Sequence, residues 1–246
     1  MRISRTGSIV AIVLALAGCG RLIPDAPVNG VNRPVALGPV RSVAGADTGL
    51  IDAPVEGGTR GRIARASSGL DVCLATLEAA RVRFTPVPDR VNSETCGLTA
   101  AGVLGLDMGT VARMAPADAT LTCETALAVS VWRRQSVEPA ARELLGSDVV
   151  QIDHYGTYAC RSVSNRPGAR PSAHSRAAAI DIAGFRLRDG RRITVASDWS
   201  GSGPEAVFLR RIRDDACTIF GTALSPDYDA AHQDHLHLEP GRPFCR

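Results

Sequence analysis

The sequence predicts an α+β domain in which a small, mostly antiparallel sheet is flanked by helices and braced by disulfides. Helical and strand patterns follow one another without the regular βαβ order that is typical of a parallel sheet. An Asp189-Gly190 pair separates two strand-like segments and is a strong hairpin signal. The chain contains seven cysteines, and all but Cys19 form an even set that is available for disulfides.

The first elements of the domain are a helix at 71–80 and a strand at 81–85. Apolar residues recur at helical spacing over 119–135, with Glu124 and Arg134 able to face water, which predicts an amphipathic helix. A second helix begins near Pro139 and ends at Gly146. A strand is predicted at 149–153.

The second half of the domain contains the predicted hairpin. Its strands lie at 178–187 and 192–196. Another amphipathic helix spans 204–220 and presents Phe208, Ile212 and Ile219 on one side. The last predicted strand covers 235–238.

Composition excludes some classes of function. The 246 residues are 45% hydrophobic and 22% charged, which is ordinary for a globular protein and sufficient for one sizeable core. The net charge of +3 is small, and the basic residues form no block or stripe that would bind a phosphate backbone. We therefore expect no nucleic-acid partner.

Residues 1–18 have the pattern of a signal peptide. Arg2 and Arg5 form a positive start, and the apolar run 9–17 is too short to span a bilayer comfortably. The run ends in Leu-Ala-Gly-Cys at 16–19, which matches the bacterial lipobox. We expect cleavage before Cys19 and lipidation of its thiol. The alternative is an ordinary secretory peptide with a cysteine at the cleavage site by chance.

Both interpretations place the mature protein outside the cytoplasm. The usual Asp signal for inner-membrane retention is absent after Cys19, where Gly20 stands, so the sequence favours a periplasm-facing lipoprotein of the outer membrane. Residues 19–68 contain many Pro and Gly and no aromatic residue, which predicts a flexible tether. The folded domain is expected to span residues 69–246.

The remaining six cysteines are Cys73, Cys96, Cys123, Cys160, Cys217 and Cys245. An even number in an oxidising compartment predicts three disulfides. The alternatives are buried free thiols or a thiolate metal site, although no CxxC pair is present. Proximity along the chain favours the pairs Cys73–Cys96, Cys123–Cys160 and Cys217–Cys245.

Histidines cluster near the C-terminus. His232, His235 and His237 fall within six residues, and His235 and His237 are two apart. On a strand, residues two apart point to the same face. Two imidazoles on one face indicate either a bound ligand or proton transfer. The alternative is a hydrogen-bonded pair on the surface.

A carboxylate in an apolar strand supplies the second half of a candidate site. Asp181 lies within the apolar segment 178–182, where an unpaired charge is costly. Metal coordination or a salt bridge would relieve that cost. His174, seven residues upstream, lies on the loop that leads into this strand. Two histidines and one aspartate make a three-ligand set with an open position, which is typical of catalytic zinc. Such an ion activates water at neutral pH.

These residues resemble two related families. Ser172, His174, Ala179 and Asp181 match the SxHxxGxAxD signature of the D-Ala-D-Ala metallopeptidases, and His235-Leu236-His237 matches their C-terminal HxH. His232 adds a grouping that looks like the penicillin-insensitive murein endopeptidase branch. From Cys73 to Arg246 the chain is still more similar to the bacterial extensin-like C-terminal domain family. The segments that carry this similarity are Cys96-Gly97, Cys123-Glu124-Thr125-Ala126, Glu138-Pro139-Ala140-Ala141, Tyr158-Ala159-Cys160-Arg161, 180–185, Ala216-Cys217 and 232–237.

The resemblance implies a D-Ala-D-Ala metallopeptidase-like fold and one Zn²⁺ per chain. It makes His174, Asp181 and His237 the metal ligands. His235 would be a catalytic histidine that acts as general base or stabilises the oxyanion. Asp234 stands where some relatives place a catalytic Glu, but a regular strand would turn it away from the metal.

The sequence departs from these families at three points. Ala177 replaces the signature Gly, which matters only if the backbone there needs a positive φ. Ala173 stands where the extensin-like family usually has an acidic residue. The arginine with which relatives hold a substrate carboxylate has no clean match. Arg161 is a candidate for this role, and the alternative is an ordinary surface arginine.

These observations lead to one functional hypothesis and its rivals. We expect a zinc metallopeptidase of the cell envelope, of the D,D-carboxypeptidase or murein endopeptidase type, with peptidoglycan peptides as substrates and a lipid anchor in the membrane. The alternative is a non-catalytic module of the same fold that binds peptidoglycan or has a structural role. Metal content and turnover on purified sacculi distinguish these possibilities.

Overall fold

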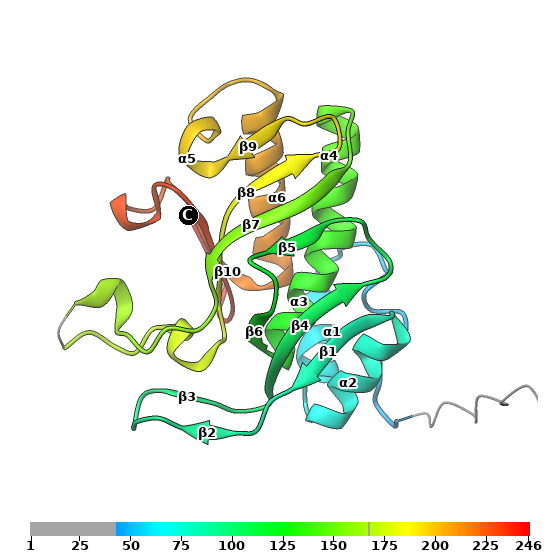
Figure 1. Cartoon of the computed structure of the whole chain (residues 1–246), viewed down its shortest axis with the longest axis vertical. Helices are drawn as coiled ribbons and strands as arrows, with labels where there is room; N and C mark the ends of the chain where they lie inside the picture. Colours follow the sequence, from blue (N-terminus) through cyan, green and yellow to red (C-terminus); the bar gives the residue numbers. More distant parts are fainter. Residues whose placement is uncertain (1–42, 167) are drawn as a thin grey trace, which may run out of the picture. The chain divides into compact units, whose positions relative to one another are not determined.

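The computed structural model describes residues 43–166 and 168–246 (Figure 1). The predicted signal peptide, Cys19 and the tether up to residue 42 lie outside the described residues. Among the described residues, no helix has the length and apolar character needed to cross a membrane.

The folded body begins earlier in the chain than the sequence predicted. Leu50 and Ile51 are buried, and α1 (Thr59–Ala66) buries Ile63 against the core. Residues 43–68, which we predicted to be part of the tether, are therefore part of the domain. The many glycines and prolines of this segment led to the prediction of a tether. Its few apolar residues are buried only because the rest of the domain provides a surface for them.

A three-stranded sheet forms one part of the domain, in the order β1-β4-β6. Its strands are β1 (Val82–Pro86), β4 (Ala101–Asp107) and β6 (Ala119–Thr122), and all of its pairings are antiparallel. Helix α2 (Leu70–Ala79) leads into β1, as the sequence predicted. Between β1 and β4, strands β2 (Arg90–Val91) and β3 (Gly97–Leu98) form a two-stranded hairpin.

A seven-stranded sheet forms the second part, in the order β12-β10-β11-β8-β7-β5, with β9 paired to β8. Its strands are β5 (Arg113–Ala115), β7 (Val149–Gly156), β8 (Ile180–Leu187), β9 (Arg192–Thr194), β10 (Gly221–Leu224), β11 (Leu236–Pro240) and β12 (Phe244–Cys245). Only the β5–β7 and β10–β12 pairs are parallel. The α+β class and the mainly antiparallel pairing are thus confirmed. The single small sheet is wrong, because short edge strands from distant segments extend the larger sheet.

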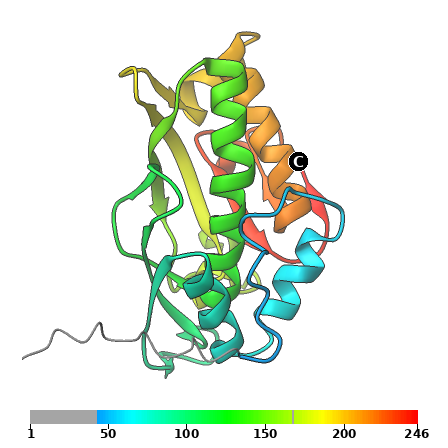
Figure 2. The ribbon, with the colours of Figure 1, turned by 90° about the vertical axis from the view of Figure 1, so that its right-hand side faces the viewer.

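Two long helical segments pack side by side against one face of the larger sheet (Figure 2). Helix α3 (Cys123–Trp132) continues through a π-helical turn (Arg133–Val137) into α4 (Glu138–Leu145), which ends at the left-handed Gly146. Helix α6 (Pro204–Ile219) begins at the predicted residue and ends one residue before the predicted limit. A short helix, α5 (Val195–Asp198), follows β9, and 3-10 turns occupy Val163–Asn165, Ala173–Arg176 and Ala230–His232.

The amphipathic helix predicted over 119–135 is wrong in two respects. Residues 119–122 form β6, and Thr122 ends the strand by capping α3 through the Thr125 amide. The helix is also buried on nearly all sides, so that even Arg134 is enclosed. Helical periodicity starts in β6 because a short apolar-polar alternation fits both periods.

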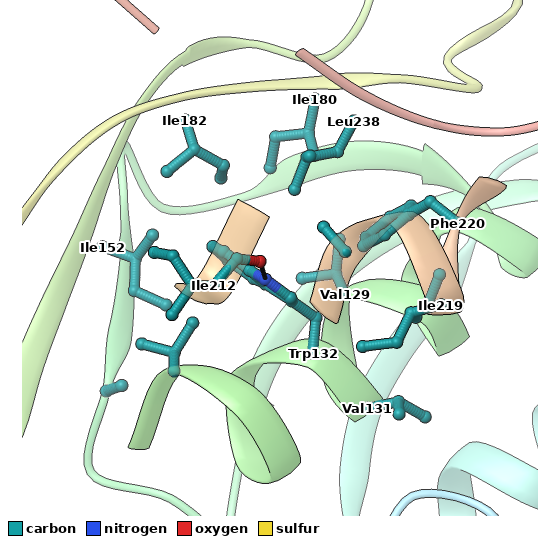
Figure 3. Close-up of a cluster of buried hydrophobic side chains, with 14 of the residues drawn as sticks. Val129, Val131, Trp132, Ile152, Ile180, Ile182, Ile212, Ile219, Phe220 and Leu238 are labelled. Carbon is teal, nitrogen blue, oxygen red and sulfur yellow. Dashed lines mark hydrogen bonds between the residues drawn. The ribbon is translucent and has the colours of Figure 1, made fainter. Parts of the chain in front are cut away.

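The main core lies between these helices and the sheet. Trp132 is completely buried and donates a hydrogen bond from Nε1 to the Ile212 carbonyl, 2.8 Å away. Figure 3 shows Ile180, Ile182 and Leu238 of the sheet facing this indole. One face of β8 and β11 is therefore committed to the core.

A buried ion cluster joins the smaller sheet to the helical segment. Asp107, at the end of β4, pairs with Arg133 at 2.6 Å and also with Arg134. The side chains of Arg133 and Asp107 are almost fully buried. Arg134 also reaches the exposed Asp52 at 2.6 Å. One carboxylate thus compensates two enclosed guanidinium groups.

Three disulfides brace the domain, but two of the predicted pairs are wrong. The bonds are Cys73–Cys123, Cys96–Cys160 and Cys217–Cys245, of which only the last was predicted. The correct partners of Cys73 and Cys96 lie 50 and 64 residues away. Proximity along the chain failed because α2 packs on α3, while the β2–β3 hairpin reaches the loop after β7.

We expect the removal of a long disulfide loop to be costly. Replacing Cys96 and Cys160 together by Ser should lower the free energy of unfolding by ~2–5 kcal/mol, because the unfolded chain gains conformational freedom. Denaturant unfolding measures this loss. Peptide mapping of the oxidised protein that recovers Cys73–Cys96 or Cys123–Cys160 would contradict the connectivity.

Loss of Asp107 should also destabilise the domain strongly. In the Asp107→Ala variant two buried guanidinium groups lose their shared carboxylate, so we expect a loss of ~3–5 kcal/mol. Asp52→Ala is the matched control, because it removes an exposed partner of the same Arg134 and should cost at most ~1 kcal/mol. Equal losses in urea unfolding of the two variants would count against the buried cluster.

Candidate metal centre

Two adjacent strands place the central pair of the candidate site. Ile180 and Ile182 of β8 point into the core, so Asp181 between them points to the opposite face. On β11, Leu236 and Leu238 likewise point into the core, so His237 between them points to the opposite face. The antiparallel register sets His237 directly opposite Asp181. The site therefore lies on the face of the sheet away from the helical core.

A short turn brings the third residue over this face. His174 lies in the 3-10 turn Ala173–Arg176, which Ser172 begins by accepting a hydrogen bond from the His174 amide. Ala177 ends the turn with a φ of 56°, in the left-handed region that favours Gly. The departure from the signature at this position thus falls where the backbone needs a positive φ.

The side chains of His174, Asp181 and His237 are in direct contact with one another. His174 Nε2 lies 3.1 Å from Asp181 Oδ1 and 3.2 Å from His237 Nδ1. His237 Nδ1 lies 2.9 Å from the same carboxylate oxygen. All three residues are buried, and their ligand atoms lie within 4.8 Å of one another. The predicted ligands are thus one cluster, although they come from three separate segments of the chain.

The outer nitrogen of each histidine has a hydrogen-bond partner. The Nδ1–H of His174 donates to the Thr157 carbonyl at 3.1 Å, which leaves Nε2 free to face the centre. The Nε2–H of His237 donates to Glu239 Oε2 at 2.9 Å, which leaves Nδ1 facing the centre. Outer partners of this kind fix the tautomer and orientation of histidines that bind metals.

The protein groups alone polarise this cluster. Burial by itself raises the pKa of Asp181, but hydrogen bonds to His174 and His237 hold that pKa well below its usual range. Burial lowers the pKa of His237, whereas its hydrogen bonds to Asp181 and Glu239 outweigh burial and raise the pKa to about 9. The site therefore combines an ionised carboxylate with a positively charged imidazolium. A metal ion that binds there would have to displace the additional proton of His237.

The donor set fits a small divalent ion. Four-coordinate zinc with bonds of ~2.0–2.2 Å places neighbouring ligand atoms about 3.3 Å apart. The three separations here, 2.9, 3.1 and 3.2 Å, lie within a few tenths of an ångström of that value. His174, Asp181 and His237 can therefore hold a metal ion with little rearrangement.

A fourth histidine lies beside the cluster. His235 directly precedes β11, and its Nε2 lies 3.6 Å from Asp181 Oδ1. Its Nδ1–H donates to Asp234 Oδ1 at 2.9 Å. Asp234 thus contacts the outer side of His235 and orients it. The exposed Tyr155 packs edge-on against the same imidazole, with ring centroids 5.9 Å apart.

The remaining predicted residues line the approach to the cluster. Arg161 follows Cys160 and reaches to 3.8 Å from Asp181 Oδ2. His232 lies next to His235 and His237, and its Nδ1 lies 2.6 Å from Asp229 Oδ1. Both side chains border a cavity of about 530 Å³ that His235 and His237 also line.

Sequence reasoning missed two contributors to the site. Glu239 is two residues after His237 on β11, so strand alternation alone places the two side chains on one face. Extending the His235-Leu236-His237 pattern by one step would have found it. Thr157 acts through a backbone carbonyl, and the sequence contains no signal for that contact.

Glu239 should strengthen metal binding without being a ligand. We expect Glu239→Gln to lower Zn²⁺ affinity ~10–100-fold, because the charged acceptor that orients His237 is lost. Glu143→Gln, an exposed change on α4, is the control and should have no effect. The measurement is a zinc titration against a chromophoric chelator at fixed pH. Unchanged affinity in Glu239→Gln would show that the contact has no role in metal binding.

Comparisons with known proteins agree with the position of these motifs. A family model described as extensin-like protein C-terminus matches residues 71–246. Searches of curated proteins and of solved structures gave no match. The matched region contains the described sheets, the three disulfides and every residue of the candidate centre. The chain therefore belongs to the extensin-like protein C-terminus family.

Proposed function

We propose that this protein is a zinc metallopeptidase that cleaves peptides of peptidoglycan, of the D,D-carboxypeptidase or murein endopeptidase type. One observation carries the proposal. Ligand atoms of three buried residues converge beside a further histidine, and both His237 of this cluster and that histidine, His235, line an open cavity. A structural zinc site is usually closed by four protein ligands, whereas a catalytic site leaves one position open. The D-Ala-D-Ala metallopeptidase-like fold is part of the same proposal.

Zinc is the ion that suits this donor set best. Two imidazole nitrogens and one carboxylate oxygen match catalytic zinc sites, whereas Ca²⁺ and Mg²⁺ favour sets made of oxygen alone. When bound, the ion would supply Lewis acidity that activates water and polarises the scissile carbonyl.

The protein groups around the ion have separate tasks. His235 donates its Nδ1–H to Asp234, so its Nε2 faces the centre with a free lone pair. That atom is suited to accept a proton from the attacking water and to pass it to the leaving amine. The Arg161 guanidinium lies near enough to Asp181 to share the negative charge that develops on the carbonyl oxygen.

The proposed setting is the bacterial cell envelope. Three disulfides are expected in an oxidising compartment. Lipidation at Cys19 would anchor the chain to the outer membrane on its periplasmic side, where peptidoglycan is accessible. The lipobox at 16–19 supports the lipidation, and Gly20, in place of the Asp that signals inner-membrane retention, supports the outer membrane.

A non-catalytic peptidoglycan-binding or structural module is the second candidate. The observation that favours it concerns Asp234, which occupies the place of a catalytic Glu in some relatives. Its carboxylate pairs with the outer nitrogen of His235 and is 44% exposed. If His235 does not act as the base, the same centre would hold a metal ion and bind a peptide without cutting it.

Variants of two neighbouring histidines separate metal binding from catalysis. We expect His237→Ala to lose both zinc and hydrolysis, because a ligand is removed. His235→Ala should retain zinc and lower turnover of muropeptides by ~10²–10⁴-fold, the usual contribution of a positioned acid or base. Asp234→Asn should have a smaller effect, because it disturbs only the orientation of His235.

The measurements are zinc content and muropeptide digestion on the same preparations. Loss of zinc in His235→Ala with retention in His237→Ala would reverse the ligand assignment. A wild-type protein that binds zinc and releases no fragment from any muropeptide would favour the binding module.

A further inference from the structure

The cavity over the metal centre extends well beyond the ligands. His235, His237 and Glu239 belong to its floor. One wall is formed by residues 161–166 and 170–173, where Ser162 and Pro171 form an isolated bridge and the Val163 amide donates to the Arg170 carbonyl. The other is the C-terminal segment 222–244. In Figure 1 both segments project on the same side of the ribbon, yellow-green and orange to red.

The lining of this cavity has an excess of positive charge. Four arginines contribute to it: Arg161, Arg166, Arg170 and Arg242. The two acidic residues of the same lining, Asp229 and Glu239, each contact a histidine, at 2.6 and 2.9 Å. Each of these carboxylates is thus engaged by a histidine, and the four arginines outnumber the two of them.

Three of these arginines have no ion-pair partner within the described part of the chain. Arg161 is close to Asp181, but Arg166, Arg170 and Arg242 lie within 4.0 Å of no carboxylate there. Unpaired guanidinium groups in a cavity are suited to bind carboxylates with directed hydrogen bonds.

We infer that this cavity is a subsite for an acidic peptide, and that Arg170 and Arg242 bind carboxylates of the substrate away from the scissile bond. The inference rests on the proposed function, because the proposed cleavage takes place at the metal centre beside this cavity. It goes further by naming a substrate class: a peptide with side-chain carboxylates in addition to its C-terminal one. The stem peptide of peptidoglycan, with D-glutamate and diaminopimelate, meets this requirement when those carboxylates are free.

A matched pair of peptides tests the inference. Both have the sequence L-Ala–γ-D-Glu–diaminopimelate–D-Ala–D-Ala and a free C-terminus. In one, the free carboxylates of the glutamyl and diaminopimelyl residues are intact, and in the other both are carboxamides. Binding is measured by titration calorimetry on zinc-loaded, full-length His235→Ala, so that hydrolysis does not deplete the ligand.

We expect the acidic peptide to bind about 10–100-fold more tightly than the amidated one, as directed hydrogen bonds to charged groups imply. Adding Arg170→Gln and Arg242→Gln should remove most of that difference and leave affinity for the amidated peptide unchanged. Arg186→Gln, which removes an exposed charge of β8 outside the cavity lining, is the control and should preserve the difference.

Two results would overturn the inference. One is equal affinity for the two peptides, or no binding of either. The other is a difference that survives in the Arg170→Gln, Arg242→Gln protein. Digestion of both peptides by the wild-type protein tests the proposed function separately. Cleavage without charge preference rejects the subsite alone, whereas charge-dependent binding without cleavage rejects the peptidase alone.

Discussion

The antiparallel pairing of β8 with β11 is the interaction on which the rest of the site depends. It sets His237 opposite Asp181, and the same register directs the isoleucines of β8 and the leucines of β11 into the core. A shift by one residue would bring the charged pair into the core and the apolar residues to the cavity. Burial of the core thus holds the candidate ligands in place, and no separate device is needed to align them. The two imidazoles that contact the enclosed carboxylate help to offset the cost of burying it.

Around this pair, hydrogen bonds and a disulfide connect the short turns and loops that carry the other residues of the site. His174 lies on a short turn, but its Nδ1–H is bonded to Thr157 and the neighbouring Ser175 hydroxyl donates to the Thr95 carbonyl at 2.9 Å. Thr95 precedes Cys96, whose disulfide to Cys160 fixes the chain next to Arg161. The β2–β3 hairpin, the turn of His174 and the loop of Arg161 are therefore one connected unit. This connection gives the two-stranded hairpin a role in positioning the site that its small size does not indicate.

Charge is distributed in two zones with different consequences. At the centre, Asp181 and Glu239 surround His237 and favour a cation there. Further out, arginines dominate the lining of the cavity and favour an anion. A peptide with carboxylates, whose scissile carbonyl must reach a cation, is complementary to both zones at once. The proposed peptidase and its proposed acidic substrate follow from this single arrangement, although they are separable in experiment.

The sequence by itself determined the elements whose signals are local. The start of α6 and the hairpin around Gly190 follow from periodicity and turn chemistry within short segments. The grouping of His174, Asp181 and His237 was predicted from the resemblance to known families, since His174 and His237 are 63 residues apart. Only the tertiary structure decided which cysteines pair, that Leu50 and Ile51 belong to the core, that α3 is buried on nearly all sides, and that Glu239 orients His237. These features depend on contacts between segments tens of residues apart, or on which face of a strand meets a cavity. The physical reason is that the hydrophobic effect and disulfide geometry act on distance in space, and one sequence pattern is compatible with several spatial pairings until the whole core has formed.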